Sequence, residues 1–361
     1  MFIFHGTVPS CDTEKLIEIF AEVVIHGVIC EPDVQKEKWV ILKELDEMEP
    51  NKEKVAMDYL QSIAFQDTEI EKSVYPETNV IKNFCAENLI SFRNRLFRTC
   101  FMTLVCIGPL NLQKLQQIIC EYFLIEPDEC KPLSGLHRGV KLPEPFGYRF
   151  SGGDLRFRDD DEELGYVALG FEGSNCKECQ DHFVLTVAKE IVGSWSKLSG
   201  GQHHNAPYIA HCAFNTELCD LYKSFFFNLS HTSIWGCYFV SDKLKLKEMI
   251  QMLQKEWMRL CTTITKKEVE RAVNQCKMNE LMILNDPVDR FYDIVSSLFK
   301  WGYCEPIHQR LRRYECIQNQ HLNEVVIKYI YDQSPAVVAL GRIENLPDYC
   351  NISNGLYLLR F

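Results

Sequence analysis

The spacing of apolar residues predicts that the first third of the chain is mostly helical. Over residues 12–27 apolar side chains recur every three or four positions, the period of a helix with one buried face. A second helix is predicted from about residue 32 to residue 49, where Pro50 and Asn51 interrupt the pattern. Further helices are predicted over residues 52–64, 86–98 and 110–123.

One segment of this first part has the pattern of a strand instead. Residues 100–108, CFMTLVCIG, are apolar at nearly every position and are followed by Pro109. A short apolar run that ends at Gly-Pro predicts a strand buried on both faces. Residues 125–146 then contain several prolines and predict a linker.

Beyond the linker, strands and helices are intermixed, which predicts an α+β fold of antiparallel sheets packed with helices. Strands around a turn are predicted within residues 148–173, and single strands over 233–242 and 336–341. Helices are predicted over residues 182–195, 242–261 and 265–282, with a last helix ending at Tyr331.

An internal repeat relates the two parts of the chain. With a shift of 233 residues and no gaps, a helix leads into an apolar strand and a glycine in both copies. The matched pairs are Leu89 and Leu322, Ile107 and Leu340, Gly108 and Gly341, Leu110 and Ile343, and Glu37 and Glu270. Glu44, in contrast, falls on Lys277, so the shared fold does not require an acid there. Glu44 is therefore a candidate for a role of its own.

Glu37 and Glu44 are seven residues apart on the predicted helix 32–49, which places them two turns apart on one face. That face is flanked by Ile41, Leu45 and Met48, which should point inward. Burying an unpaired carboxylate is costly, so this arrangement predicts that the two acids hold a ligand or a partner.

Composition limits the classes of function. The chain has 361 residues, enough for two domains of ordinary size, and its 46% hydrophobic and 25% charged residues are typical of globular rather than disordered proteins. With a net charge of -11 and no basic stripe, a nucleic-acid partner is excluded. An acidic surface suits basic peptides, and it is also common among soluble proteins. No apolar run approaches the ~20 residues of a membrane helix, and the first residues, MFIFHG, do not form a presequence.

Cysteine and histidine patterns do not indicate a metal site. The 17 cysteines are scattered, which favours reduced thiols in an intracellular compartment. Cys176 and Cys179 form a CxxC without a second pair at zinc-finger spacing, which predicts a loop with two free thiols. A further group of possible ligands follows no recognised spacing: His203, His204, His211, Cys212 and Cys219.

Long motifs carry a family resemblance that covers essentially the whole chain. Residues 35–70, QKEKWVILKELDEMEPNKEKVAMDYLQSIAFQDTEI, resemble the zinc-ligand helix and following segment of M16 metallopeptidases. The resemblance is to the group of the mitochondrial processing peptidase β subunit and core protein 1 of the cytochrome bc1 complex. Residues 233–242, 253–272 and 328–349 are similar to the same group.

The resemblance implies what Glu44 and Glu37 are. Catalytic M16 subunits bind zinc through two histidines of an HxxEH helix and a downstream glutamate, and the glutamate of the motif activates the zinc-bound water. The downstream ligand matches Glu44, and a second acidic position matches Glu37. None of the ten histidines are four residues apart, so the chain holds no HxxEH. Because catalytic zinc needs three protein ligands, the resemblance implies no catalytic residues and no tightly bound zinc here.

A second departure concerns substrate binding. In the family, two acidic residues ten and fourteen positions after the ligand glutamate are implicated in holding the arginine of basic presequences. They correspond to Lys54 and Asp58 here, and Lys54 would repel an arginine. Asp58 is therefore a candidate substrate-binding residue, the alternative being an exposed helix residue.

The resemblance implies two homologous M16 units, the first truncated, over residues 1–124 and 147–361, with the linker 125–146 between them. It implies a structural or peptide-binding chain, catalytically incompetent in this form. It also implies a hetero-oligomer with an α-type M16 subunit, like processing peptidase α or core protein 2, in the mitochondrial matrix or on the matrix face of the inner membrane. The alternative is an active zinc endopeptidase that removes presequences, if the natural product carries an upstream HxxEH.

Overall fold

The structure is a computed structural model that describes residues 2–109, 111–123, 149–175, 179–199, 207–229 and 232–360. The predicted linker 125–146 lies outside these residues, as do Cys176, His203 and His204. By its contacts the chain divides into two compact units, each built from several segments. Unit 1 comprises Met1–Asp46, Tyr75–Leu142 and Pro287–Val295, and unit 2 comprises Glu47–Val74, Pro143–Asp286 and Ser296–Phe361.

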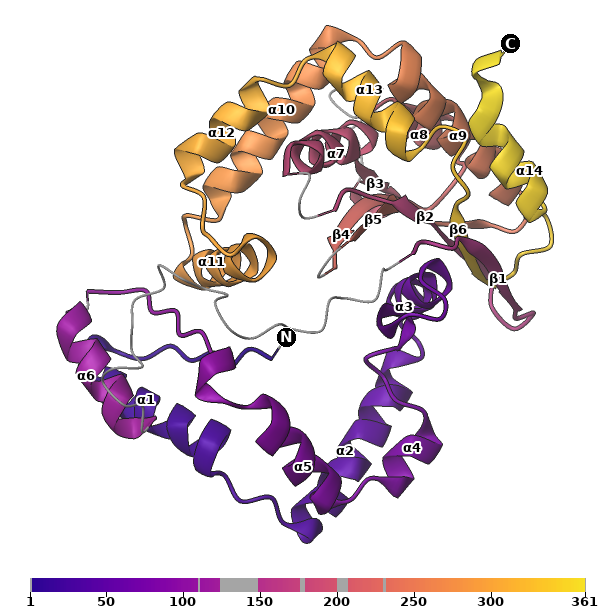
Figure 1. The fold of residues 1–361 in the computed structure, drawn as a ribbon. Helices are drawn as coiled ribbons and strands as arrows, with labels where there is room; N and C mark the ends of the chain where they lie inside the picture. Colours follow the sequence, from indigo (N-terminus) through magenta and orange to yellow (C-terminus); the bar gives the residue numbers. More distant parts are fainter. Residues whose placement is uncertain are drawn as a thin grey trace. The chain divides into compact units, whose positions relative to one another are not determined.

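In the residues of unit 1 that the structure describes, all regular structure is helical, as Figure 1 shows. The helices confirm those predicted over residues 12–27, 32–49, 86–98 and 110–123, and α1 packs on α6. They are η1 (Ser10–Asp12), α1 (Thr13–Ala21), the π-helix η2 (Glu22–His26), α2 (Glu31–Met48), α4 (Thr78–Asn83), α5 (Ala86–Leu96), η4 (Thr99–Phe101) and α6 (Leu112–Tyr122).

The strand predicted over residues 100–108 is wrong. Thr99–Phe101 forms a 3-10 turn, and residues 102–107 are neither helix nor strand. Met102 itself has extended backbone angles, φ -96° and ψ 141°, so the local preference for extended structure is met. In the described part of unit 1 there is no strand beside this segment, and a strand exists only through hydrogen bonds to a neighbour.

Unit 2 contains a six-stranded sheet with the order β1-β6-β2-β5-β4-β3. The predicted antiparallel pairing holds between all neighbouring strands except β1 and β6, which are parallel. The cause is that β6 lies between β1 and β2, which therefore do not form a hairpin. The strands are β1 (Gly153–Arg158), β2 (Leu164–Glu172), β3 (Ser194–Ser196), β4 (Leu221–Asn228), β5 (Ser233–Asp242) and β6 (Ala336–Gly341).

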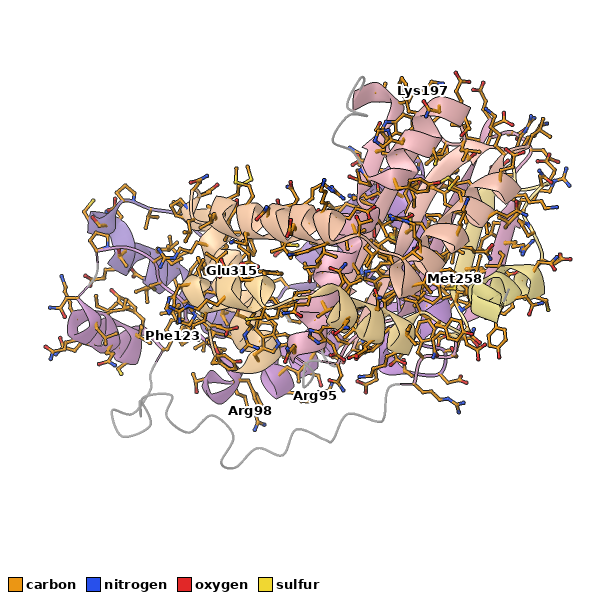
Figure 2. The ribbon with its side chains drawn as sticks, turned by 90° about the horizontal axis from the view of Figure 1, so that it is seen from above. Arg95, Arg98, Phe123, Lys197, Met258 and Glu315 are labelled. Carbon is orange, nitrogen blue, oxygen red and sulfur yellow. The ribbon has the colours of Figure 1, made fainter. Side chains whose placement is uncertain are left out.

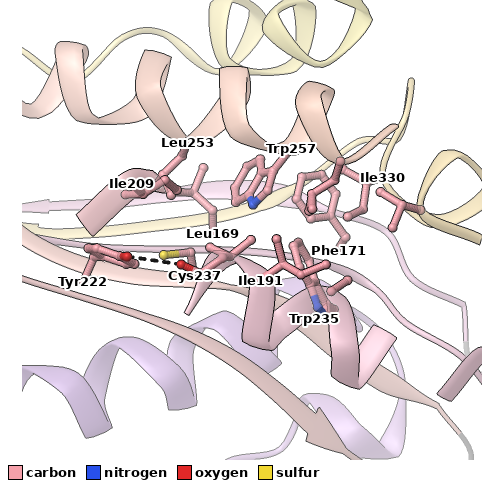
Figure 3. Close-up of a cluster of buried hydrophobic side chains, with 14 of the residues drawn as sticks. Leu169, Phe171, Ile191, Ile209, Tyr222, Trp235, Cys237, Leu253, Trp257 and Ile330 are labelled. Carbon is pink, nitrogen blue, oxygen red and sulfur yellow. Dashed lines mark hydrogen bonds between the residues drawn. The ribbon is translucent and has the colours of Figure 1, made fainter. Parts of the chain in front are cut away.

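The main core of unit 2 joins the sheet to α7, α9, α10 and α13. Trp235 on β5 and Trp257 on α9 are among its largest fully buried side chains, and both rings pack against Phe171 (Figure 3). The Trp235 indole donates to the backbone oxygen of Leu185 at 3.1 Å, which satisfies its polar group inside the core. The helices are α7 (Cys179–Val192), α8 (Tyr208–Thr216), α9 (Leu246–Thr262), α10 (Lys266–Met282), α11 (Pro287–Trp301, shared with unit 1), α12 (Ile307–Glu315), α13 (Asn319–Tyr329) and α14 (Tyr349–Asn354), with the 3-10 turns η3 (Glu69–Glu71), η5 (Lys197–Ser199) and η6 (Gly355–Arg360).

Helix α3 (Lys52–Ala64), which matches the predicted range, packs on the sheet of unit 2. Asn51 caps it by accepting a hydrogen bond from the Lys54 backbone nitrogen at 3.2 Å. Its apolar positions form a second cluster with Ala168, Phe225, Ile234, Tyr238 and Val338 of the sheet. Because the sheet is covered on both faces, β5 and β6 are buried along nearly their whole length, which confirms them as continuous apolar strands.

Candidate functional site

The two carboxylates singled out by the sequence lie on the solvent-exposed surface of α2. Glu37 and Glu44 are both exposed, and neither makes a hydrogen bond or an ion pair with any described residue. The apolar stripe predicted beside them is only half-buried, and Val34 is the one buried residue of the helix. Neither acid is paired within the part of the chain that the structure describes, so the expectation that they hold a ligand or a partner stays a prediction.

The carboxylate of α2 that has a defined structural role is Glu31, in the first turn of the helix. Its side chain accepts a hydrogen bond from the backbone nitrogen of Ala86 at 2.8 Å and another from Gln35 at 2.7 Å. The bond from Ala86, which begins α5, and the bond from Gln35 lower the pKa of Glu31 below its ordinary value. Sequence reasoning missed this contact because it joins residues that are 55 positions apart.

The described donor set does not fit a catalytic zinc site. No group of three His, Cys, Asp or Glu side chains lies close enough together to hold a metal within the ranges the structure covers. Glu44 contributes a single carboxylate, whereas catalytic zinc takes three protein ligands and a water. His203 and His204 fall outside the described residues, so the expectation that the chain binds no zinc tightly stays a prediction.

Asp58 lies half-buried on α3 in unit 2, whereas Glu37 and Glu44 belong to unit 1. Two charged neighbours on α3 are engaged in pairing with the rest of unit 2: Lys52 with Glu162 at 3.0 Å and Glu53 with Lys223 at 2.8 Å. These pairs help to hold α3 on the sheet. Asp58 makes no such pair among the described residues, and its role in binding a basic peptide stays a prediction.

Unit 2 contains an ion cluster that sequence reasoning missed. Arg259 on α9 pairs with the fully buried Glu256 at 2.6 Å and with Glu268 on α10 at 2.8 Å. Burial would raise the pKa of Glu268, but the hydrogen bonds from Arg259 and Thr265 outweigh it and hold that pKa at about 2. The signal in the sequence is Thr265 followed by Glu268, which forms a capping box at the start of α10. The cluster therefore fastens two helices together.

A surface groove runs along α9 in unit 2, beside Met258 (labelled in Figure 2). Its volume is about 1010 Å³, and α14 and η6 supply the opposite wall through Asn351 and Gly355. Among the described residues that line it there is no Asp, Glu, His or Cys. The groove consequently offers no carboxylate, imidazole or thiolate to act as a metal ligand or acid–base group, and its charged lining residues are Lys247, Lys255 and Arg259.

Family profiles match both parts of the chain. Residues 1–77 match the profile described as "Insulinase (Peptidase family M16)", and residues 83–276 match "Peptidase M16 inactive domain". The second match alone covers more than half of the chain. The chain belongs to the M16 peptidase family. The expected α+β class of this M16 protein is confirmed as well, with the sheet of unit 2 packed between helices.

Curated relatives place this M16 chain near two kinds of mitochondrial subunit. It is 30% identical to the mitochondrial-processing peptidase subunit beta of Bos taurus over 354 residues, which cover 98% of this chain and 70% of that protein. It is 31% identical to cytochrome b-c1 complex subunit 1 of Mus musculus over 352 residues, which cover 98% of this chain and 72% of that protein. The predicted resemblance to this group is confirmed.

A solved structure supports the fold. A chain of complex III2 from Candida albicans, bound to Inz-5, superposes with a TM-score of 0.84 at 20% identity, covering 97% of this chain and 81% of that chain. No helix in the part of the M16 chain that the structure describes is both long and apolar enough to cross a bilayer.

Proposed function

We propose that this M16 chain is a non-catalytic, structural subunit of a hetero-oligomeric assembly of the processing-peptidase and complex III kind. The proposal rests on the surroundings of Glu37 and Glu44 on helix α2. By the resemblance, Glu37 and Glu44 match the family's downstream acids, yet no described imidazole, thiolate or further carboxylate joins them to form a metal site. A carboxylate in water does not hold a catalytic metal by itself.

The proposed partner is an α-type M16 subunit, similar to processing peptidase α or core protein 2. The relatives support this because their printed names are those of subunits, "subunit beta" and "complex subunit 1". The same names support a mitochondrial location for this chain, which we propose to be the matrix or the matrix face of the inner membrane. We also propose that its two homologous units correspond to residues 1–124 and 147–361.

Co-expression with an α-type subunit tests the proposal. The purified complex is assayed for subunit ratio, for zinc by mass spectrometry and for cleavage of a basic presequence peptide with and without a chelator. We expect an equimolar complex, no stoichiometric zinc and no chelator-sensitive cleavage.

The matched variants are Glu44→Gln and, as a control at an exposed acid directly after the same helix, Glu49→Gln. Bound zinc and cleavage that are both lost in Glu44→Gln but retained in Glu49→Gln would overturn the non-catalytic role. Failure of the two chains to copurify would overturn the proposal of an α-type partner.

A further inference from the structure

The groove along α9 is held open by a contact between its two walls. Gln254 on α9 is only 5% exposed, and its side-chain nitrogen donates to the backbone oxygen of Ile352 in α14 at 2.7 Å. A Cβ added at Gly355 would overlap the same side-chain amide, so the backbone of η6 reaches Gln254 only because residue 355 is glycine. The wall formed by α14 and η6 is therefore fixed at a set distance from α9.

The same amide offers a hydrogen-bond acceptor to the groove. The nitrogen of Gln254 faces the carbonyl of Ile352, which only accepts, so the other end of the amide is the oxygen. That oxygen accepts no hydrogen bond from any described residue, and Gln254 lines the groove. A nearly buried acceptor is satisfied best by an N–H donor that enters the groove.

One row of side chains on α9 gives the groove its charge. Every fourth residue from Lys247 lines it, and the row is Lys247, Gln251, Lys255, Arg259 and Thr263. The charge of Arg259 is taken up by Glu256 and Glu268. Lys247 and Lys255 are exposed and form no ion pair with any described residue. They are eight residues apart on the helix, so about 12 Å separates them.

The internal repeat reverses the charge of this row. With the shift of 233 residues, the positions of Lys247, Gln251 and Lys255 fall on three acids of unit 1, namely Glu14, Glu18 and Glu22. The shared fold therefore does not require cations there. The whole chain is acidic, with 50 acidic and 39 basic residues, so a groove that has lysines and no described acid is an exception to its composition.

Other parts of this chain match the groove less well. By the same repeat, residues directly upstream of Met1 would take positions equivalent to those before residue 234, and no described residue before 234 lines the groove. The linker 125–146 carries three cations among its acids, and the two lysines would repel them. The charges therefore favour a segment of another protein that has acids and no cations.

We propose that the groove between α9 and the segment Pro347–Gly355 binds an extended, acidic segment of another protein. The lining of α9 spans about 24 Å from Lys247 to Thr263, the length of roughly seven residues of extended chain. Carboxylates four residues apart in such a chain point the same way and are about 13 Å apart, which matches the two lysines. A backbone N–H of the segment donates to the oxygen of Gln254.

Two other anionic ligands fit these observations less well. A small anion such as phosphate does not span the distance between Lys247 and Lys255. A fatty acid would place its acyl chain against Gln254 and leave the amide oxygen without a donor, which is unfavourable. The inference goes beyond the proposed structural role and does not depend on it.

The test measures peptide binding to the full chain by fluorescence anisotropy. The labelled probe is Val-Glu-Thr-Thr-Thr-Glu-Val, whose β-branched residues favour an extended chain and whose acids are four residues apart. The control peptide, Val-Thr-Glu-Glu-Thr-Thr-Val, has the same composition, but its adjacent acids point to opposite sides. We expect the control peptide to bind about fivefold more weakly or worse, because it reaches one lysine at a time.

Variants of the chain locate the site. Lys247→Gln with Lys255→Gln is expected to weaken binding of the probe about tenfold. Lys266→Gln with Lys267→Gln changes the net charge equally at exposed positions that do not line the groove, and it is expected to preserve binding. Lys247→Glu with Lys255→Glu is expected to reverse the preference, so that Val-Lys-Thr-Thr-Thr-Lys-Val binds better than the acidic probe. An unchanged circular dichroism spectrum shows that each variant is folded.

Three results would overturn the proposal. The first is equal binding of the probe and the control peptide, which would indicate attraction without a defined site. The second is unchanged affinity in the variant that lacks both lysines. The third is no binding of the probe to the intact chain, which includes the case that residues of the chain itself fill the groove.

Discussion

The two units share a repeated sequence pattern but differ in how much of it they bury. Helix α13 buries Leu322, Val325 and Val326, whereas α5, with the matching bounds in unit 1, buries only Ala86. The difference follows from the sheet: α13 belongs to the core that covers the strands of unit 2, while the described part of unit 1 has no strands. An amphipathic helix thus needs a second layer before its apolar face contributes to stability.

The matched helices α2 and α10 also differ in how deeply their side chains are buried. Trp39 on α2 is 76% exposed, and its counterpart Ala272 on α10 is 0% exposed. Lys277, the counterpart of Glu44, donates to Glu315 at 2.7 Å (Glu315 is labelled in Figure 2). In unit 2 this position fastens α10 to α12, while in unit 1 it carries an acid that is free to serve another purpose.

Among the substitutions that compare the two units, Arg259→Ala is expected to lower the unfolding free energy most. Arg259→Ala leaves the fully buried Glu256 without its partner, which is expected to cost about 3–5 kcal/mol of unfolding free energy. The counterpart in the repeat is His26, an exposed residue at the end of η2, and His26→Ala is expected to cost less than about 1 kcal/mol. Urea unfolding followed by circular dichroism measures both. Equal losses would show that the cluster does not fasten α9 to α10.

A slightly smaller effect is expected for the matched leucines. Leu322→Ala removes a fully buried side chain and is expected to cost about 2–5 kcal/mol. Leu89→Ala acts on a half-buried side chain and is expected to cost about half as much or less. The measurement is again urea unfolding, with each variant referred to the unmodified chain. A larger cost at Leu89 than at Leu322 would contradict the view that unit 1 lacks a second layer.

Acid is expected to destabilise unit 2 more than unit 1. The pKa of Glu268 is held near 2 in the folded chain, below the ordinary value of 4.5. The stabilisation is therefore complete above pH 4.5 and is lost as the pH falls toward 2. Glu268→Gln should flatten this part of the pH–stability curve. The counterpart in unit 1 is Gln35, which does not titrate but donates a hydrogen bond to the exposed Glu31, so Gln35→Ala should change the acid limb much less than Glu268→Gln does.

The smallest change in unfolding free energy is expected for Glu44→Gln. Glu44 is exposed and has no partner among the described residues, so Glu44→Gln should change the unfolding free energy by less than about 0.5 kcal/mol. Lys277→Gln, at the matched position, loses its ion pair with Glu315 and should cost up to about 1 kcal/mol. A loss above about 2 kcal/mol for Glu44→Gln would reveal a structural partner.

Much of the fold was predictable because periodicity reports burial within one element. The bounds of α3 and β5 match the predicted ranges, since both have uninterrupted patterns and clear ends at Asn51 and Asp242. Residues 102–107 show the limit of this approach. Their composition predicts a buried strand, but a strand is completed by another segment, and pattern alone does not say whether that segment is at hand.

The candidate site was predictable in position but not in environment. The apolar pattern placed Glu37 and Glu44 on a helix, and the structure confirms that helix. It did not reveal that the helix face is open to water, because exposure depends on what packs against α2 from elsewhere in the chain. The bonds that do fasten α2, from Ala86 to Glu31 and from Lys38 to the backbone oxygen of Lys82, join residues too far apart for a local pattern.

Helix α3 comes from the early part of the chain, but it packs on the sheet of unit 2. Residues that are close in sequence can therefore belong to different cores. Leu60 and Phe65 come from the early part of the chain, yet they cover a sheet whose strands all begin after residue 150. A fragment begun at residue 147 would lack this cover and leave Phe225 and Val338 bare. Anyone dividing the polypeptide for expression should therefore keep residues 47–74 together with the later half.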